Sequence, residues 1–120
     1  MDKQARGLTN YLDGLAAEDC VEQVYRDAGA TLVRRRWRSR SGEVDLIMQL
    51  DTTFIFVEVK KAKDFASAAM RLSDRQLQRI TRAAEEFCMT APEGMETTIR
   101  IDVALVNGAS ESQIIENVTL

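Results

Sequence analysis

The stretch Gly42-Glu43-Val44-Asp45-Leu46-Ile47, followed by Glu58-Val59-Lys60, decides the fold of this chain. Between the two segments lies Asp51-Thr52-Thr53, which has the composition of a turn. The flanking residues are rich in β-branched and other apolar side chains, as strands are. We therefore expect a β-hairpin with strands over residues 43–50 and 53–60.

The predicted hairpin carries charges where a buried strand would ordinarily carry none. Successive side chains of a strand point to opposite faces, so Asp45 should point away from Val44 and Leu46. The second strand is apolar almost throughout, which indicates burial on both faces, yet it ends with Glu58 and Lys60 on one face. Charges at such a place are unfavourable unless they are paired or take part in chemistry.

Two interpretations of these charges stand side by side. In the first, Glu58 and Lys60 form an ion pair that faces water at the end of the strand. In the second, Asp45 lies beside Glu58 across the hairpin, and the two carboxylates bind Mg²⁺ or Mn²⁺ while Lys60 stabilises negative charge on a phosphate.

Asp45 followed by Glu58-x-Lys60 resembles the PD-(D/E)xK nuclease signature, with Val44 in the usual place of the proline. A longer ordered set of residues between positions 13 and 107 is similar to the YraN-like endonuclease family, a bacterial family distantly related to archaeal Holliday-junction resolvases. The set comprises Glu18, Tyr25, Gly29, Gly42 to Ile47, Val57 to Lys60, Gln76, Arg79 and Arg100-Ile101-Asp102-Val103.

The resemblance implies a restriction-endonuclease-like α/β core and metal-dependent hydrolysis of DNA, on branched or otherwise structured DNA. Asp45, Glu58 and the backbone carbonyl of Val59 would hold Mg²⁺ or Mn²⁺, and Lys60 would position the water or stabilise the transition state. Glu18 would be an outer metal ligand or a water-orienting base, although a lone helical glutamate is ordinarily a solvated residue. Gln76 would bond a metal water or a phosphate, in addition to or instead of capping a helix.

Composition sets further bounds. With 120 residues, of which 45% are apolar, we expect one domain over residues 13–120, preceded by a flexible arm over residues 1–12. No apolar run is long enough to span a membrane, and the first residues do not resemble a signal peptide, so we expect a cytoplasmic protein without a membrane partner. Cys20 and Cys88 are expected as core thiols. The absence of histidine argues against a zinc site.

The net charge of −3 is unevenly distributed. Residues 34–82 carry twelve Lys or Arg against six Asp or Glu, a net charge of +6, whereas the rest of the chain carries −9. Such polarity is typical of an electrostatic footprint for nucleic acid, and an ordinary solvated face would give the same pattern. For the arginines of residues 34–40, the alternative is a solvated edge strand guarded by charge. The candidate nucleic-acid contacts are Arg34, Arg36, Arg38, Arg40, Lys61, Lys63, Arg75 and Arg79.

The remaining elements follow from periodicity and end signals. We expect a helix over residues 13–28 that stops at Gly29, with an apolar stripe of Ala17, Cys20, Val21, Val24 and Ala28 and with Glu18 and Tyr25 at its edge. A strand over 31–38 would place Arg34, Arg36 and Arg38 on one face and Val33, Arg35 and Trp37 on the other. By the family resemblance, residues 65–71 would be a mobile connection.

Towards the C-terminus, Ser73 and Gln76 form a capping-box pattern that opens a helix to about Met89. Strands are expected over residues 98–106, where Arg100 and Asp102 would form a structural ion pair, and over 113–120. The order is α-β-β-β-α-β-β, which predicts an α/β fold with a mixed central sheet flanked by helices.

The sequence therefore favours a Mg²⁺- or Mn²⁺-dependent endonuclease that acts on nucleic acid, with DNA as the expected partner and a homodimer as one arrangement. The leading alternative is a non-catalytic nucleic-acid-binding or protein-interaction module that retains a nuclease-like fold. A third interpretation is a small α/β scaffold with a strand-end ion pair, to which no divalent cation would bind.

Overall fold

The protein is described over residues 2–118 by a computed structural model. Its elements are α1 (Lys3–Asp27), β1 (Thr31–Arg38), β2 (Glu43–Leu50), β3 (Thr53–Lys61), α2 (Phe65–Met70), α3 (Asp74–Cys88), the 3-10 turn η1 (Gly94–Glu96), β4 (Thr98–Val106) and β5 (Ser112–Ile115). The predicted hairpin is confirmed, because β2 and β3 pair in antiparallel register with Leu50 opposite Thr53.

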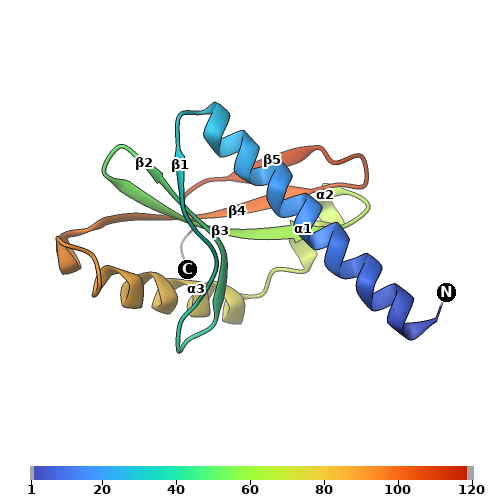
Figure 1. The fold of residues 1–120 in the computed structure, drawn as a ribbon, viewed down its shortest axis with the longest axis horizontal. Helices are drawn as coiled ribbons and strands as arrows, with labels where there is room; N and C mark the ends of the chain where they lie inside the picture. The colour runs from blue at the N-terminus through green and yellow to red at the C-terminus, as the bar shows by residue number, and fades with distance from the viewer. Residues whose placement is uncertain (1, 119–120) are drawn as a thin grey trace.

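The five strands form one mixed sheet in the order β1-β2-β3-β4-β5, in which only β3 and β4 run parallel. The parallel pair needs a long crossover, and α2 and α3 lie within it. Helix α1 covers one face of the sheet, and α3 covers the other (Figure 1). The predicted mixed α/β fold is thus confirmed, with α2 and η1 as two short elements that were not expected.

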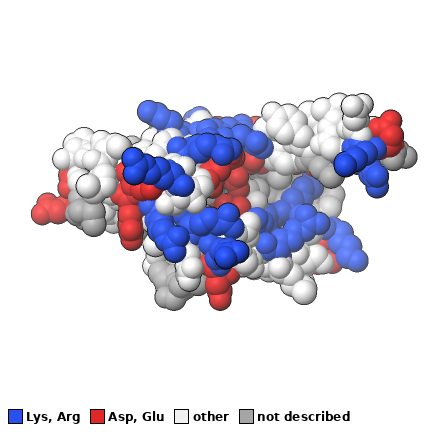
Figure 2. All heavy atoms as spheres, turned by 90° about the horizontal axis from the view of Figure 1, so that it is seen from below, with Lys and Arg blue, Asp and Glu red and all other residues white. Residues whose placement is uncertain are grey.

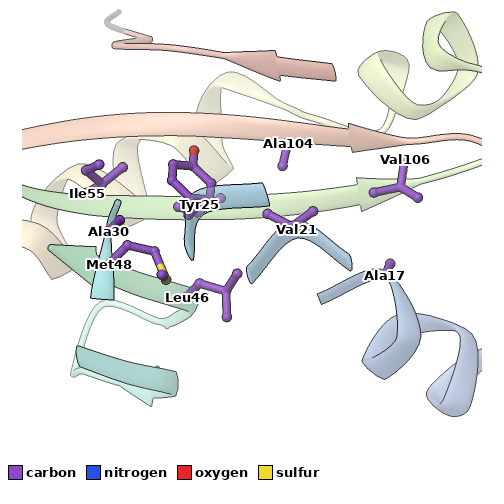
Figure 3. Close-up of a cluster of buried hydrophobic side chains, with 10 residues drawn as sticks. Ala17, Val21, Tyr25, Ala30, Leu46, Met48, Ile55, Ala104 and Val106 are labelled. Atoms are coloured by element: carbon purple, nitrogen blue, oxygen red, sulfur yellow. The ribbon is translucent and has the colours of Figure 1, made fainter. Parts of the chain in front are cut away.

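The hydrophobic core lies on both faces of β3. Towards α1, Val21 and Tyr25 pack on Leu46, Met48 and Ile55 (Figure 3). Towards α3, Phe56 packs with Val44, Ile47, Ile80, Ala83, Ala84 and Ile101. The nearly continuous apolar sequence of β3 is explained by this double burial, as a central strand of a three-layer domain requires.

Helix α1 begins at Lys3, ten residues before the expected start at Asp13. The segment that we expected as an arm is therefore helical, and the Asp2 carboxylate caps it by accepting a hydrogen bond from the Ala5 N–H at 2.8 Å. The apolar period was absent there because Leu8, Tyr11 and Leu12 are all more than half exposed. The other end was predicted correctly: the helix stops before Gly29, whose φ is +97°.

The buried stripe of α1 is rotated from the expected one. Glu18 and Tyr25, expected at its edge, are buried beside Ala17 and Val21, whereas Val24 is exposed. Ala28 is exposed as well and Cys20 is partly buried. Two polar side chains can be buried here because each finds a partner on the sheet: the Tyr25 hydroxyl donates to Asp102 Oδ2 at 2.6 Å, and Glu18 accepts from Arg36.

Strand β1 does not keep the simple alternation that we expected. A bulge between Leu32 and Arg34 shifts its register, and Arg36 has a φ of +51°. As a result Arg35 leaves the side of Trp37 and turns to α1, where its guanidinium donates to Asp19 at 2.6 Å. Bulges re-aim side chains in this way, and the alternation of isolated residues could not predict it.

Strand β2 also departs from the expected pattern. Val44 packs with Ile47 and Phe56 on the α3 side, rather than with Leu46 and Met48 on the α1 side. The alternation thus breaks at Asp45, which is the residue that the sequence singled out.

In the second half of the chain, α3 follows the expectation, whereas the segment before it and the last strand differ from it. Ser73 and Gln76 form the predicted capping box of α3, which ends at Cys88. Within the segment expected as a mobile connection, residues 65–70 form α2. Strand β5 ends at Ile115, short of the expected end at residue 120, which lies outside the described residues. Cys20 and Cys88 are free thiols, and among residues 2–118 no helix could cross a membrane.

Candidate active site

The candidate site forms where β2 and β3 separate. Their paired register reaches Leu46 and Val57. Beyond it, the Asp45 carboxylate replaces the partner strand: Oδ2 accepts a hydrogen bond from the Val59 N–H at 2.8 Å. The Asp45 side chain therefore lies against β3 itself, next to Glu58. This side-chain-to-backbone bond provides a local reason for the break in alternation at Asp45.

The three residues of the signature meet in one cleft. Asp45, Glu58 and Lys60 line a hollow of about 870 Å³, together with Val59 and Glu18. The remaining lining residues are Asp13, Gly14, Ala17, Lys61, Ala62, Lys63, Arg71 and Gly108. The hollow is thus bounded by α1 on one side and by the chain that leaves β3 on the other, and it is large enough for a phosphate group and its neighbours.

The two carboxylates of the cleft repel each other. Burial and the neighbouring Glu58 raise the pKa of Asp45 to about 7, although the hydrogen bond from Val59 opposes the shift and the charge of Glu18 adds to it. Burial also raises the pKa of Glu58, against the lowering effects of Lys60 and of a hydrogen bond with Asp45. A carboxylate beside another in a desolvated site behaves as Asp45 does, and such pairs are common at functional sites.

Lys60 forms an ion pair with Glu58, its Nζ lying 3.2 Å from Glu58 Oε1. The ion pair of the first interpretation is therefore present. It does not face water freely, because the side chains of Lys60 and Glu58 are only 15% and 12% exposed. A partly buried pair of this kind is weak evidence for stabilisation, so the two interpretations are compatible in one site.

Glu18 reaches the cleft from α1 and is 5% exposed. Its carboxylate accepts two hydrogen bonds from Arg36, at 3.1 Å from Nε and 2.8 Å from Nη2. Arg35 Nε lies 3.6 Å from the same carboxylate. Glu18 is thus buried and paired, in contrast to the solvated residue that a lone helical glutamate would suggest.

Gln76 serves the helix and lies near the site. Its side-chain oxygen accepts a hydrogen bond from the Ser73 N–H at 3.2 Å, which confirms the capping role. Gln76 also lines a narrow hollow of about 90 Å³ together with Glu58 and Arg79. The two uses proposed for this residue are therefore compatible.

The predicted nucleic-acid contacts fall into two basic groups around the cleft. Lys61 and Lys63 line the cleft itself, whereas Arg75 and Arg79 line a separate hollow of about 430 Å³ on α3 with Arg82. Figure 2 shows basic side chains gathered on the face that carries α3, with acidic atoms between them.

The arginines of β1 and its following turn differ among themselves. Arg34, Arg38 and Arg40 are exposed, and Arg38 pairs with Glu43 at 3.3 Å. Arg36 is bonded to Glu18 instead of standing free for a phosphate. The alternating pattern predicted the same role for all four arginines. In the structure they differ in exposure and in the partners that they bind.

Six residues of the cleft were not predicted as site residues: Asp13, Gly14, Ala17, Ala62, Arg71 and Gly108. Arg71 was visible in the sequence as part of the basic segment. Gly108 was visible as a turn residue, and its N–H donates to the Lys63 carbonyl at 3.1 Å. This bond joins the β4–β5 turn to the chain after β3, a contact between distant segments that a local pattern does not reveal.

The donor set of the cleft suits a hard cation with few protein ligands. Within residues 2–118 no group of three or more His, Cys, Asp or Glu is placed to hold a metal ion. Mg²⁺, however, is commonly bound by one or two carboxylates and keeps several waters. The Asp45–Glu58 pair fits that requirement, because a cation between two repelling carboxylates would remove the cause of their repulsion.

The fold and the cleft define a mixed α/β protein with two repelling carboxylates and a lysine at a strand end, surrounded by basic side chains. The chain belongs to the uncharacterised protein family UPF0102, whose family model matches residues 17–106. It is 49% identical over 113 residues to a UPF0102 protein of Ruegeria pomeroyi, covering 94% of this chain and 92% of that protein.

Other relatives also match this chain over almost its whole length. A UPF0102 protein of Cereibacter sphaeroides is 47% identical over 111 residues, with 92% of this chain and 95% of the relative covered. One from Dinoroseobacter shibae is 40% identical over 118 residues, with 98% and 88% covered. These relatives match almost the whole of this chain.

Proposed function

We propose that this protein is a metal-dependent nuclease of the PD-(D/E)xK class that hydrolyses phosphodiester bonds of DNA, with branched or otherwise structured DNA as its substrate. The observation that carries the proposal is the meeting of Asp45, Glu58 and Lys60 in one cleft. The hairpin β2–β3 followed by a helical crossover to β4 supports a restriction-endonuclease-like core as the finer description of the fold.

In this proposal Asp45, Glu58 and the Val59 carbonyl hold Mg²⁺ or Mn²⁺. When bound, such an ion lowers the pKa of a water molecule and polarises the scissile phosphate. The Asp45 carboxylate is oriented for this task by the Val59 N–H. The carboxylates must be ionised to bind a cation, and the raised pKa of Asp45 places that ionisation near neutral pH.

The remaining side chains bind and orient the substrate. Lys60 stabilises the negative charge that builds on the phosphate, a role that requires its ammonium to exchange Glu58 for a phosphate oxygen. Lys61, Lys63 and Arg71 bind flanking phosphates along the cleft. Gln76 and Glu18 orient water from the two sides.

The test compares Asp45→Ala and Lys60→Ala with wild type. Cleavage of linear, nicked and four-way DNA in Mn²⁺ should fall about 10²-fold or more in both variants, while calorimetry should show Mn²⁺ binding lost in Asp45→Ala alone. Asp51→Asn, a change in the exposed hairpin turn, is the matched control. Nicking by both variants at the wild-type rate would refute the assignment.

A non-catalytic nucleic-acid-binding module is the second candidate, and the Lys60–Glu58 pair at 3.2 Å favours it, since the Lys60 ammonium already neutralises Glu58 without a cation. This candidate predicts DNA binding that weakens steeply with salt and no hydrolysis in Mg²⁺, Mn²⁺ or Ca²⁺. The same assay therefore separates the two functions.

A further inference from the structure

Arg36 holds an unusual backbone conformation beside the cleft. Its φ of +51° lies in the left-handed region, which a residue with a side chain rarely adopts inside a strand. Conformations of this kind persist where surrounding contacts enforce them, and they gather at functional sites. At Arg36 this conformation accompanies a bidentate hydrogen bond to Glu18, at 3.1 and 2.8 Å.

The two arginines that approach Glu18 have different roles. Arg35 is anchored elsewhere, donating to Asp19 at 2.6 Å and to the Leu15 carbonyl at 3.1 Å. Arg36 is the more exposed of the two, and it stacks over the Tyr11 ring at 5.5 Å. Arg35 therefore belongs to the packing of α1 on β1, whereas Arg36 could exchange Glu18 for another anion without disturbing that packing.

Glu18 is the residue that such an exchange would change. It is almost fully buried, lines the cleft with Asp45 and Glu58, and has its charge neutralised by Arg36. Without that partner, the carboxylate would keep only the more distant Arg35 Nε, at 3.6 Å, beside two other carboxylates. The most favourable response would be to take a share of a cation in the cleft.

We propose that Arg36 is a substrate-operated latch. In the free protein its guanidinium holds the Glu18 carboxylate; a backbone phosphate of the nucleic acid then takes the guanidinium, and Glu18 is released to become the third carboxylate of the cation site. Arg36 is thus a positioning residue, and Glu18 gains its ligand role only with substrate bound. The inference rests on the proposed function and adds the order of events.

The latch makes a prediction about cation affinity in the absence of DNA. Arg36→Gly removes the guanidinium and suits the positive φ, so the freed Glu18 should make Mn²⁺ binding by calorimetry at least about tenfold tighter. Arg36→Gly combined with Glu18→Gln should return to the wild-type affinity. Arg34→Ala, which removes an exposed charge from the same strand, should leave the affinity within about twofold of wild type.

The outcomes separate the latch from the proposed function. Wild-type binding of Mn²⁺ with no gain in Arg36→Gly, or an equal gain in Arg34→Ala, overturns the latch alone. Absence of Mn²⁺ binding in both wild type and Arg36→Gly overturns both proposals, whereas binding in Arg36→Gly alone supports the latch. If Arg36→Gly does not fold, Arg36→Lys replaces it, because lysine keeps the charge without the bidentate donor. Arg36→Lys should show a smaller gain in Mn²⁺ affinity than expected for Arg36→Gly. No gain in Mn²⁺ affinity overturns the latch.

The substrate step has its own test. By reciprocity of linked binding, duplex DNA should tighten Ca²⁺ binding more in the wild-type protein than in Arg36→Gly, in which the latch is already open. Equal tightening in the two proteins would show that DNA does not act through Arg36.

Discussion

Asp45 illustrates how a single carboxylate can lower stability in favour of a binding site. Its pKa in the folded protein is raised from the ordinary 3.8 to about 7. Between those values the folded state keeps a proton that the unfolded state releases, so stability falls as pH rises through this window. Above about pH 7 the full penalty is present.

The substitution Asp45→Asn should therefore stabilise the protein in the absence of divalent cations. The gain at pH 8 should be on the order of 1–4 kcal/mol, since one pKa unit corresponds to about 1.4 kcal/mol, and it should shrink towards pH 4. Urea unfolding at both pH values measures it, with the exposed Asp51→Asn as control. A gain that is equal at the two pH values would mean that charge is not its cause.

Tyr25 and Asp102 connect two elements that lie far apart in the chain. The Tyr25 hydroxyl on α1 donates to Asp102 on β4 at 2.6 Å. Asp102 is fully buried and also accepts from Arg100 at 2.9 and 3.0 Å and from the Asn117 N–H at 2.9 Å. The predicted Arg100–Asp102 ion pair is confirmed, and it belongs to a network that joins α1, β4 and the segment after β5.

Removing the hydroxyl should loosen this network. Tyr25→Phe should lower the free energy of unfolding by about 1–3 kcal/mol, because a buried acceptor loses a short bond. Tyr11→Phe, at an exposed position of the same helix, should change it by less than about 0.5 kcal/mol. Equal effects of the two substitutions in chemical denaturation would contradict the assigned role of the Asp102 network.

At the level of elements, sequence patterns predicted the helices and strands whose ends are set by local turn and capping residues. Strands β1, β2 and β4 have the expected bounds, because turn residues and alternation mark them. The start of α1 at Lys3, the bulge before Arg34 and helix α2 were missed. An exposed helical extension leaves no apolar period, and a bulge depends on the partner strand.

The candidate site divides in the same way. The hairpin brings Asp45, Glu58 and Lys60 together through short-range geometry, so their meeting could be predicted. The pairing of Glu18 with Arg36 joins α1 to an irregular strand, and no spacing in the sequence indicates it. What the sequence could not supply was the set of contacts between elements.

On the scale of the whole molecule, the segregation of charge should govern the proposed binding to DNA. A protein with a net charge of −3 can bind a polyanion only through a local basic surface, here the rim of the cleft and α3. Binding should therefore weaken as salt rises, with a logarithmic slope of about −0.9 for each phosphate contacted.

Replacing Lys61 and Lys63 together by alanine should reduce the magnitude of that slope by about 1.8, for two lost phosphate contacts. Fluorescence anisotropy of labelled DNA over a range of salt concentrations measures it. Arg26→Ala, which removes a charge that α1 pairs with Glu22 at 2.7 Å, should leave the slope unchanged. A slope that is the same in all three proteins would place the DNA elsewhere.

The parallel pairing of β3 with β4 has a consequence for the folding of the protein during its synthesis. In the register of the sheet Thr53 lies opposite Thr98, and residues 62–97, a stretch of 36, must be synthesised between the end of one strand and the start of the next. At about 5–20 residues per second this takes roughly 2–7 seconds. During that interval the nascent hairpin exposes the unpaired backbone N–H and C=O groups along the edge of β3, and that edge is where a chaperone or a neighbouring chain would bind first.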